Sequence, residues 1–127
     1  MTTTGRSNPR ELLDTALGLL RRADPSTAGL WPRASALLAR QALEASVLGL
    51  WERQALALQS CPMRAQLICL RTYLGDPELA ARAGHAWSAL RRACHHHPYE
   101  LAPTAGELQV WFSVVEDLIR KVGSSTD

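Results

Sequence analysis

Apolar side chains recur mostly at three- and four-residue steps between residues 32 and 56, the longest such stretch in the chain. They are Leu37, Leu38, Ala42, Leu43, Ala45, Val47, Leu50 and Trp51. Side chains at these steps share one face of an α-helix, and Arg40 and Glu44 stand one turn apart as an i,i+4 pair. The pattern predicts a long amphipathic helix that must bury its apolar face against other helices.

Start and stop signals predict helices on both sides of this stretch. Asn8-Pro9-Arg10-Glu11 supplies a cap, a first-turn proline and an acid, and predicts a helix over about residues 9–22. The breaker-rich segment 24–29 separates that helix from the long one, which begins near Trp31 or Pro32. Ser60-Cys61-Pro62 is predicted to restart the chain as a helix that continues through Tyr73.

Two further helices follow. Gly75-Asp76-Pro77 ends the preceding helix and caps the next, which is predicted from Glu78 to about His96. A capping box over 104–107 precedes a final amphipathic helix that Gly123 stops.

Short connections between these helices favour antiparallel neighbours. With 46% hydrophobic and only 6% aromatic residues, the sequence predicts an all-α fold, an up-and-down bundle of four main helices with a short additional helix. We expect a flexible N-terminus over residues 1–8, the bundle over 9–123 and a tail over 124–127.

Charge and composition limit the classes of function. A formal net charge of +2 is far below the basic excess of proteins that coat nucleic acids, so any contact with RNA must be local. Arg21-Arg22 and the isolated Arg82 do not by themselves predict a basic patch. The first seven residues lack an apolar signal core, and no stretch approaches the roughly 20 apolar residues that span a bilayer. We therefore expect a cytoplasmic protein with no membrane partner and, with three cysteines, reduced thiols.

Polar chemistry is concentrated at the end of the helix predicted to finish near His96, in the run Arg91-Arg92-Ala93-Cys94-His95-His96-His97-Pro98-Tyr99. Because the residue before a proline avoids helical backbone angles, Pro98 predicts a helix end near His96 or His97. On a continuous helix Arg92 shares a face with His96 rather than with His97. If Pro98 unwinds the last turn, His97 and Tyr99 can join Arg92, so both pairings remain open.

These side chains suit cleavage of RNA. The reaction needs a base near the 2′-hydroxyl, an acid near the leaving oxygen and positive donors for the charge that builds up on the phosphate. Histidine can serve as acid and base near neutral pH, and arginine supplies a planar, permanently charged donor. Such a site requires no metal and no other cofactor.

Three other interpretations of the run are open. Arginine and histidine can simply bind the last carbonyls of a helix and complement its dipole. Cys94 and His97 are spaced to share a metal ion, but no second ligand pair follows at a recognisable spacing, so no metal site is predicted. Cys94 is also a candidate nucleophile, although its position beside the apolar seam favours a packed sulfur.

The run resembles the signature of the HEPN superfamily, small helical bundles with an arginine and a histidine four to six residues apart near a helix end. Arg92 and His97 match this pair, and Tyr99 matches a frequent accessory position. Arg91 and His96 form an overlapping match.

Outside the run, residues 39–45 are similar to the corresponding helix of many members, and the resemblance covers most of residues 8–122. Many members carry asparagine directly after the arginine, where this chain has Ala93.

The resemblance implies an RNA-directed domain, with a metal-independent endoribonuclease of a toxin–antitoxin or defence system as the leading interpretation. Arg92 would clamp phosphate, His97 would act as general acid or base, and Tyr99 would position substrate. Members often form homodimers that bring two motifs together across a cleft. An antitoxin or a nucleotidyltransferase-like protein is the implied protein partner. The alternative is a non-catalytic HEPN-like module that binds RNA or proteins.

Overall fold

Helices make up nearly all of the chain that the structure describes. The computed structural model describes residues 8–22, 31–95 and 101–124, and in these ranges it contains five α-helices, one 3-10 helix and no strand. They are α1 (Pro9–Arg21), α2 (Trp31–Gln54), the 3-10 helix η2 (Leu56–Ser60), α3 (Met63–Leu74), α4 (Pro77–Cys94) and α5 (Ala105–Ser124). The predicted all-α class is confirmed. Of the expected N-terminal segment 1–8 and tail 124–127, only Asn8, which caps α1, and Ser124, which ends α5, lie in the described ranges.

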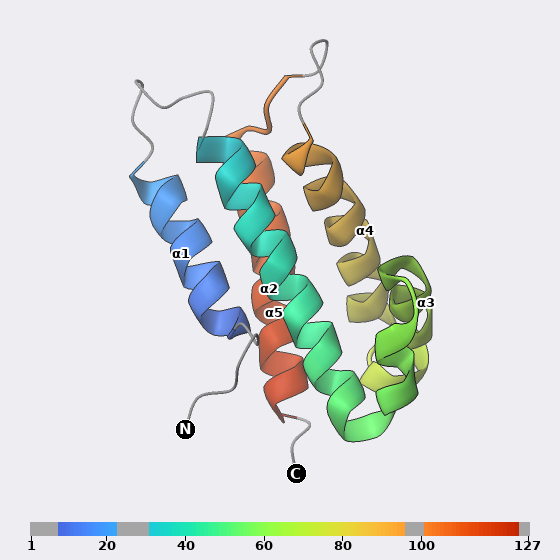
Figure 1. The fold of residues 1–127 in the computed structure, drawn as a ribbon. Coiled ribbons are helices and arrows are strands. Elements are labelled where there is room, and N and C mark those ends of the chain that lie inside the picture. The colour runs from blue at the N-terminus through green and yellow to red at the C-terminus, as the bar shows by residue number, and fades with distance from the viewer. Residues whose placement is uncertain (1–7, 23–30, 96–100, 125–127) are drawn as a thin grey trace.

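Four helices lie side by side with alternating directions, and α3 packs on the outside of α4 (Figure 1). The central helix is α2, which contacts α1, α4 and α5. The inserted α3 has 12 residues and α1 has 13, so the insertion is distinguished by its position rather than by its length. This order brings the start of α2, the end of α4 and the start of α5 to one end of the bundle (Figure 1).

Local signals set most helix ends as the sequence predicts. The side chains of Asn8 and Asp76 accept hydrogen bonds from backbone N–H groups in the first turns of α1 and α4, at 2.9 and 3.0 Å. Thr104 and Glu107 form both bonds of the capping box before α5. Gly75, with a φ of 77°, ends α3 in the left-handed conformation that only glycine adopts without strain.

Some boundaries differ from the prediction. The 3-10 helix η2 follows the end of α2 at Gln54 and was not expected, and α3 begins only at Met63. α5 continues through Gly123 to Ser124, because Gly123 does not adopt the positive φ with which glycine terminates a helix.

The core is built around α2. Its small side chains Ala36, Ala39 and Ala42 are fully buried and permit close approach of neighbouring helices. Trp51, also fully buried, donates a hydrogen bond from its indole Nε1 to Oε1 of Gln66 on α3, at 2.9 Å. This bond satisfies a buried polar group and ties α3 to the bundle. None of the helices in the described ranges has the length and apolar character needed to cross a bilayer.

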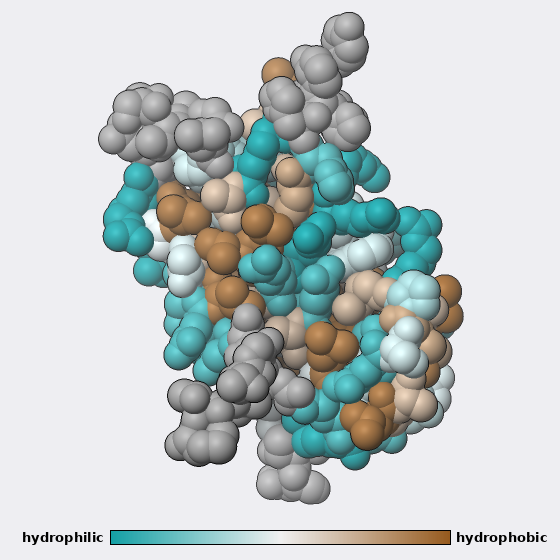
Figure 2. All heavy atoms as spheres, viewed as in Figure 1, coloured by the Kyte–Doolittle hydropathy of each residue, from teal (hydrophilic) through white to brown (hydrophobic). Residues whose placement is uncertain are grey.

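On the viewed face, hydrophobic residues gather between α1 and α2, with hydrophilic residues toward α4 (Figure 2).

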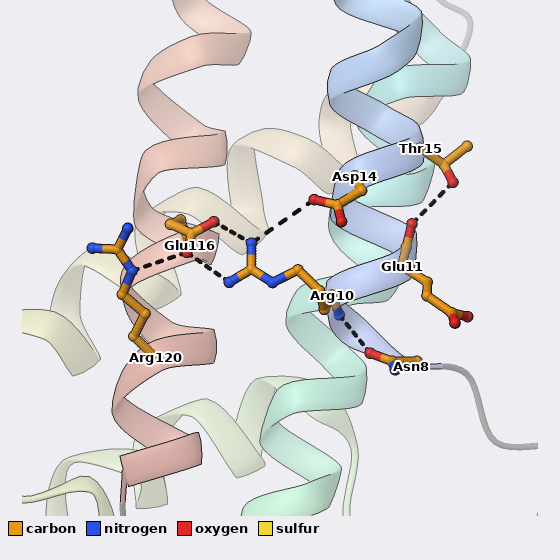
Figure 3. A network of polar contacts seen from close by, with 7 residues as sticks. All are labelled: Asn8, Arg10, Glu11, Asp14, Thr15, Glu116 and Arg120. Atoms are coloured by element: carbon orange, nitrogen blue, oxygen red, sulfur yellow. Dashed lines mark hydrogen bonds and ion pairs between the residues drawn. The ribbon is translucent and has the colours of Figure 1, made fainter.

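An ion-pair network joins α1 to α5 (Figure 3). Both Nη atoms of Arg10 donate to the carboxylate of Glu116, at 2.5 and 2.6 Å, and Arg120 donates to the same carboxylate at 3.0 Å. The hydrogen bonds from Arg10 hold the pKa of Glu116 below its ordinary value, although partial burial opposes them. Arg10 also lies 3.9 Å from a carboxylate oxygen of Asp14, so two arginines meet two carboxylates. Because its charges compensate one another, this network serves the bundle rather than a ligand.

Candidate functional site

The end of α4 differs from the sequence prediction in one consequential way. The helix stops at Cys94, before the predicted His96, and His95 has extended backbone angles, with φ −90° and ψ 138°. The N–H of His95 still donates to the carbonyl of Arg92, at 3.2 Å. Since the backbone leaves the helix at His95, the helical argument for pairing Arg92 with His96 no longer applies.

The predicted site residues divide into two groups. Arg91 and Arg92 stand exposed on the last turn of α4. His96, His97 and Tyr99 lie outside the described residues, so their pairing with the arginines stays a prediction. His95, which the sequence places beside the predicted pair, lines the same hollows as Arg92.

Arg91 is positioned by a chain of contacts that begins on α2. Its guanidinium carbon lies 5.4 Å from the ring centre of Trp87, within the range of a cation–π interaction. Nε1 of Trp87 donates to Oε2 of Glu44, at 2.8 Å. The Nε of Arg40 lies 3.7 Å from the same Glu44 oxygen, as expected for the i,i+4 pair. The hydrogen bond to Glu44 on α2 therefore fixes the ring of Trp87 against which Arg91 packs.

Arg92 and His95 also face the starts of α2 and α5. They line a hollow of about 170 Å³ together with Arg33, Glu107 and Trp111. Nη1 of Arg33 donates to the carbonyl oxygen of His95, at 2.6 Å, and so holds the segment that leaves α4. This contact joins residues 62 positions apart, and no local pattern around Arg33 predicts it.

A second hollow, of about 430 Å³, opens between the start of α3 and the end of α4. Its lining residues are Arg64, Trp87, Ser88, Arg91, Arg92 and His95. No carboxylate is among them, and within the described ranges neither Arg64 nor Arg92 forms an ion pair. Three guanidinium groups in a hollow whose lining has no carboxylate favour an anionic ligand, and their planar donors fit phosphate oxygens.

Cys94 has a different environment from the arginines beside it. Burial raises the pKa of its thiol above the ordinary value; the nearby Arg40 opposes this effect and Glu44 adds to it. A raised pKa keeps the sulfur protonated near neutral pH, which disfavours the thiolate that nucleophilic catalysis requires.

The described residues also contain no group of three or more histidine, cysteine, aspartate or glutamate side chains placed to hold a metal ion. His96 and His97 lie outside the described residues.

The described residues thus form a cationic helix end whose guanidinium groups suit an anionic ligand. The chain matches no protein-family model, no curated protein and no solved structure.

Proposed function

We propose that this chain is a HEPN-like domain that cleaves RNA without a metal ion, with Arg92, His97 and Tyr99 as its principal site residues. The observation that supports this most directly is the hollow at the end of α4, where arginines converge without a carboxylate. Among them, Arg92 lines the hollows on both sides of the helix end and is available to bind phosphate.

The proposed reaction is transesterification within the RNA strand. A base takes the proton of a ribose 2′-hydroxyl, and its oxygen forms a bond to the adjacent phosphorus. The bond from phosphorus to the 5′-oxygen of the next nucleotide breaks, and an acid protonates that oxygen. His97 acts as acid or base, and Arg92 stabilises the charge that develops on the phosphate oxygens. A 2′,3′-cyclic phosphate and a free 5′-hydroxyl result.

This activity fits a cytoplasmic toxin or defence nuclease that acts as a homodimer, with two motifs facing each other. An antitoxin or nucleotidyltransferase-like partner would restrain such an enzyme. These assignments follow the motif resemblance rather than any contact in the described residues.

A metal-free cleavage assay tests the proposal. Wild type is incubated with single-stranded RNA in a chelator, beside the Arg92→Ala/His97→Ala variant and Arg120→Ala, a charge-loss control whose side chain is 73% exposed on α5. We expect wild type and the control to cleave, and the double variant to be slower by at least about 100-fold. RNA with a deoxyribose at each cleavage position should resist wild type. No cleavage by wild type, or equal cleavage by the double variant, would overturn the proposal.

One observation favours the alternative, a non-catalytic RNA-binding module. Ala93, which stands where many HEPN members have asparagine, lines the hollow shared with Arg33 and offers no polar side chain there. RNA binding that depends on Arg92, without cleavage by any preparation, would support this module over the enzyme.

A further inference from the structure

The cationic surface at the end of α4 continues along the helix. A hollow of about 440 Å³ lies between α3 and α4, and Arg64, Trp87 and Ser88 line both it and the hollow at the helix end. The α4 residues that line the two hollows extend from Ala80 to His95, a length of about 20 Å. We call the two hollows together the α3–α4 groove.

Arginines line both parts of the groove. Arg64 and Arg71 on α3 line the hollow that extends along α4, and Arg64, Arg91 and Arg92 line the hollow at the helix end. Neither hollow has an acidic residue in its lining, and in the described ranges neither Arg64 nor Arg71 forms an ion pair.

Elsewhere on the chain, several arginines do have carboxylate partners, with 2.5 to 3.7 Å between the guanidinium nitrogen and the carboxylate oxygen of each closest pair. These are Arg10, Arg40, Arg82 and Arg120. With a net charge of only +2, this gathering of uncompensated arginines is a local feature that attracts a polyanion.

Small residues keep the groove open. Ala80, Ala81 and Gly84 form part of its α4 wall, and a Cβ added at Gly84 would meet no atom within 4 Å. Ile68, on the α3 wall, is 70% exposed, which is unusual for a large aliphatic side chain. An apolar surface between cations suits bases as well as phosphates, because a single strand presents both.

We propose that the α3–α4 groove binds a single-stranded stretch of RNA beside the cleavage site, an inference that rests on the proposed function. Guanidinium groups bind successive phosphates, and one base packs against Ile68. Packed helices lie only about 10 Å apart, so the groove between them admits a single strand more readily than a duplex.

Binding is measured separately from cleavage. A fluorescent single-stranded oligonucleotide of about ten nucleotides, with deoxyribose throughout, cannot be cleaved through a 2′-hydroxyl. Its anisotropy is titrated with wild type, with Arg64→Ala/Arg71→Ala, and with Arg21→Ala/Arg120→Ala, which removes two exposed charges from α1 and α5.

We expect the groove variant to bind about tenfold more weakly at physiological salt. The slope of the logarithm of its binding constant against the logarithm of salt concentration should be less steep by about 1.4. The control variant should bind within about twofold of wild type. Gly84→Leu changes no charge but fills the groove, so it should also weaken binding while circular dichroism stays helical. Equal affinity of the two charge variants would overturn the proposal.

Two competitors define the ligand further. Unlabelled single strand should displace the probe better than a duplex or poly-glutamate of equal charge, and equal displacement by poly-glutamate would overturn the assignment to a nucleic acid strand. If wild type binds the probe through the groove but never cleaves RNA, the groove stands and the proposed nuclease activity fails. If wild type cleaves RNA but the groove variants bind the probe normally, the proposed nuclease activity stands and the proposed groove fails.

Discussion

Glu44 on α2 accepts a hydrogen bond from the indole Nε1 of Trp87 on α4, with 2.8 Å between the two atoms. Trp87 is only 7% exposed, and the guanidinium of Arg91 lies over its ring. A contact inside the bundle therefore determines where one of the predicted site arginines stands.

Replacing Glu44 by alanine should destabilise the protein. The change leaves the buried indole N–H of Trp87 without an acceptor and Arg40 without its carboxylate partner. We expect the free energy of unfolding in urea to fall by about 2 kcal/mol. Glu44→Gln keeps an acceptor oxygen and should lose less than half as much. Equal losses in the two variants would show that the hydrogen bond to Trp87 contributes little.

Removing Arg33 should affect cleavage more than stability. Arg33 donates to the carbonyl oxygen of His95 and holds the chain where it leaves α4. We expect Arg33→Ala to slow cleavage by about tenfold or more, because small displacements of catalytic groups are costly. The free energy of unfolding should change by only about 1 kcal/mol. A variant that cleaves at the wild-type rate would mean that this contact does not position the motif.

Much of the fold is predictable because its signals are local. Asn8, Asp76 and the capping box of Thr104 and Glu107 each act within one turn of the helix that they begin. The early end of α4 is different: the backbone turns away from the helix at His95, whose carbonyl is held by a residue 62 positions away. A rule based on Pro98 alone cannot include that contact.

The candidate site is only partly predictable, because some of its residues are brought together by contacts between helices rather than by local signals. Arg91 and Arg92 belong to a recognisable motif, but Arg64 and Arg71 are single arginines on another helix. They face α4 only because α3 packs against it, so their shared groove emerges from tertiary structure. No spacing along the chain reveals a surface assembled in this way.

The bond between Arg10 and Glu116 predicts a pH dependence of stability. Folding lowers the pKa of Glu116 from its usual value of about 4.3. The ion pair therefore stabilises the protein fully above that value, and the contribution is lost as the pH falls toward the lower, folded-state pKa. We expect Glu116→Gln to lower the free energy of unfolding by about 1 kcal/mol at pH 7.

The difference between wild type and Glu116→Gln should narrow in urea titrations performed below about pH 4. Glu11→Gln, an exposed change on α1, should have a smaller effect at pH 7. A difference that is independent of pH would contradict an ionic contribution from Glu116.

Cys94 should be dispensable for cleavage. Burial raises the pKa of its thiol, so little thiolate exists near neutral pH. We expect Cys94→Ala to retain metal-free cleavage within about twofold of wild type. In a variant that keeps Cys94 as its sole cysteine, a thiol reagent should react more slowly with folded than with urea-unfolded protein. Loss of cleavage with folding intact would instead favour a nucleophilic sulfur.

The two overlapping motif registers can be separated by paired substitutions. Arg91 is engaged over the ring of Trp87, whereas Arg92 lines both hollows at the helix end and pairs with no carboxylate in the described ranges. Arg92 is thus the better placed of the two to bind a reacting phosphate, and Arg91 to hold the flanking strand. We expect Arg92→Ala/His97→Ala to slow metal-free cleavage by at least about 100-fold.

Arg91→Ala/His96→Ala should mainly weaken RNA binding and slow cleavage at saturating RNA by less than about tenfold. Because groups that act as a unit are not additive, Arg92→Ala alone should cost nearly as much as its double variant. The opposite pattern, with the Arg91 pair essential and the Arg92 pair dispensable, would assign the chemistry to Arg91 and His96. Cation–π contact with Trp87 would then orient the catalytic guanidinium, and Trp87→Leu should reduce cleavage as strongly as the loss of Arg91.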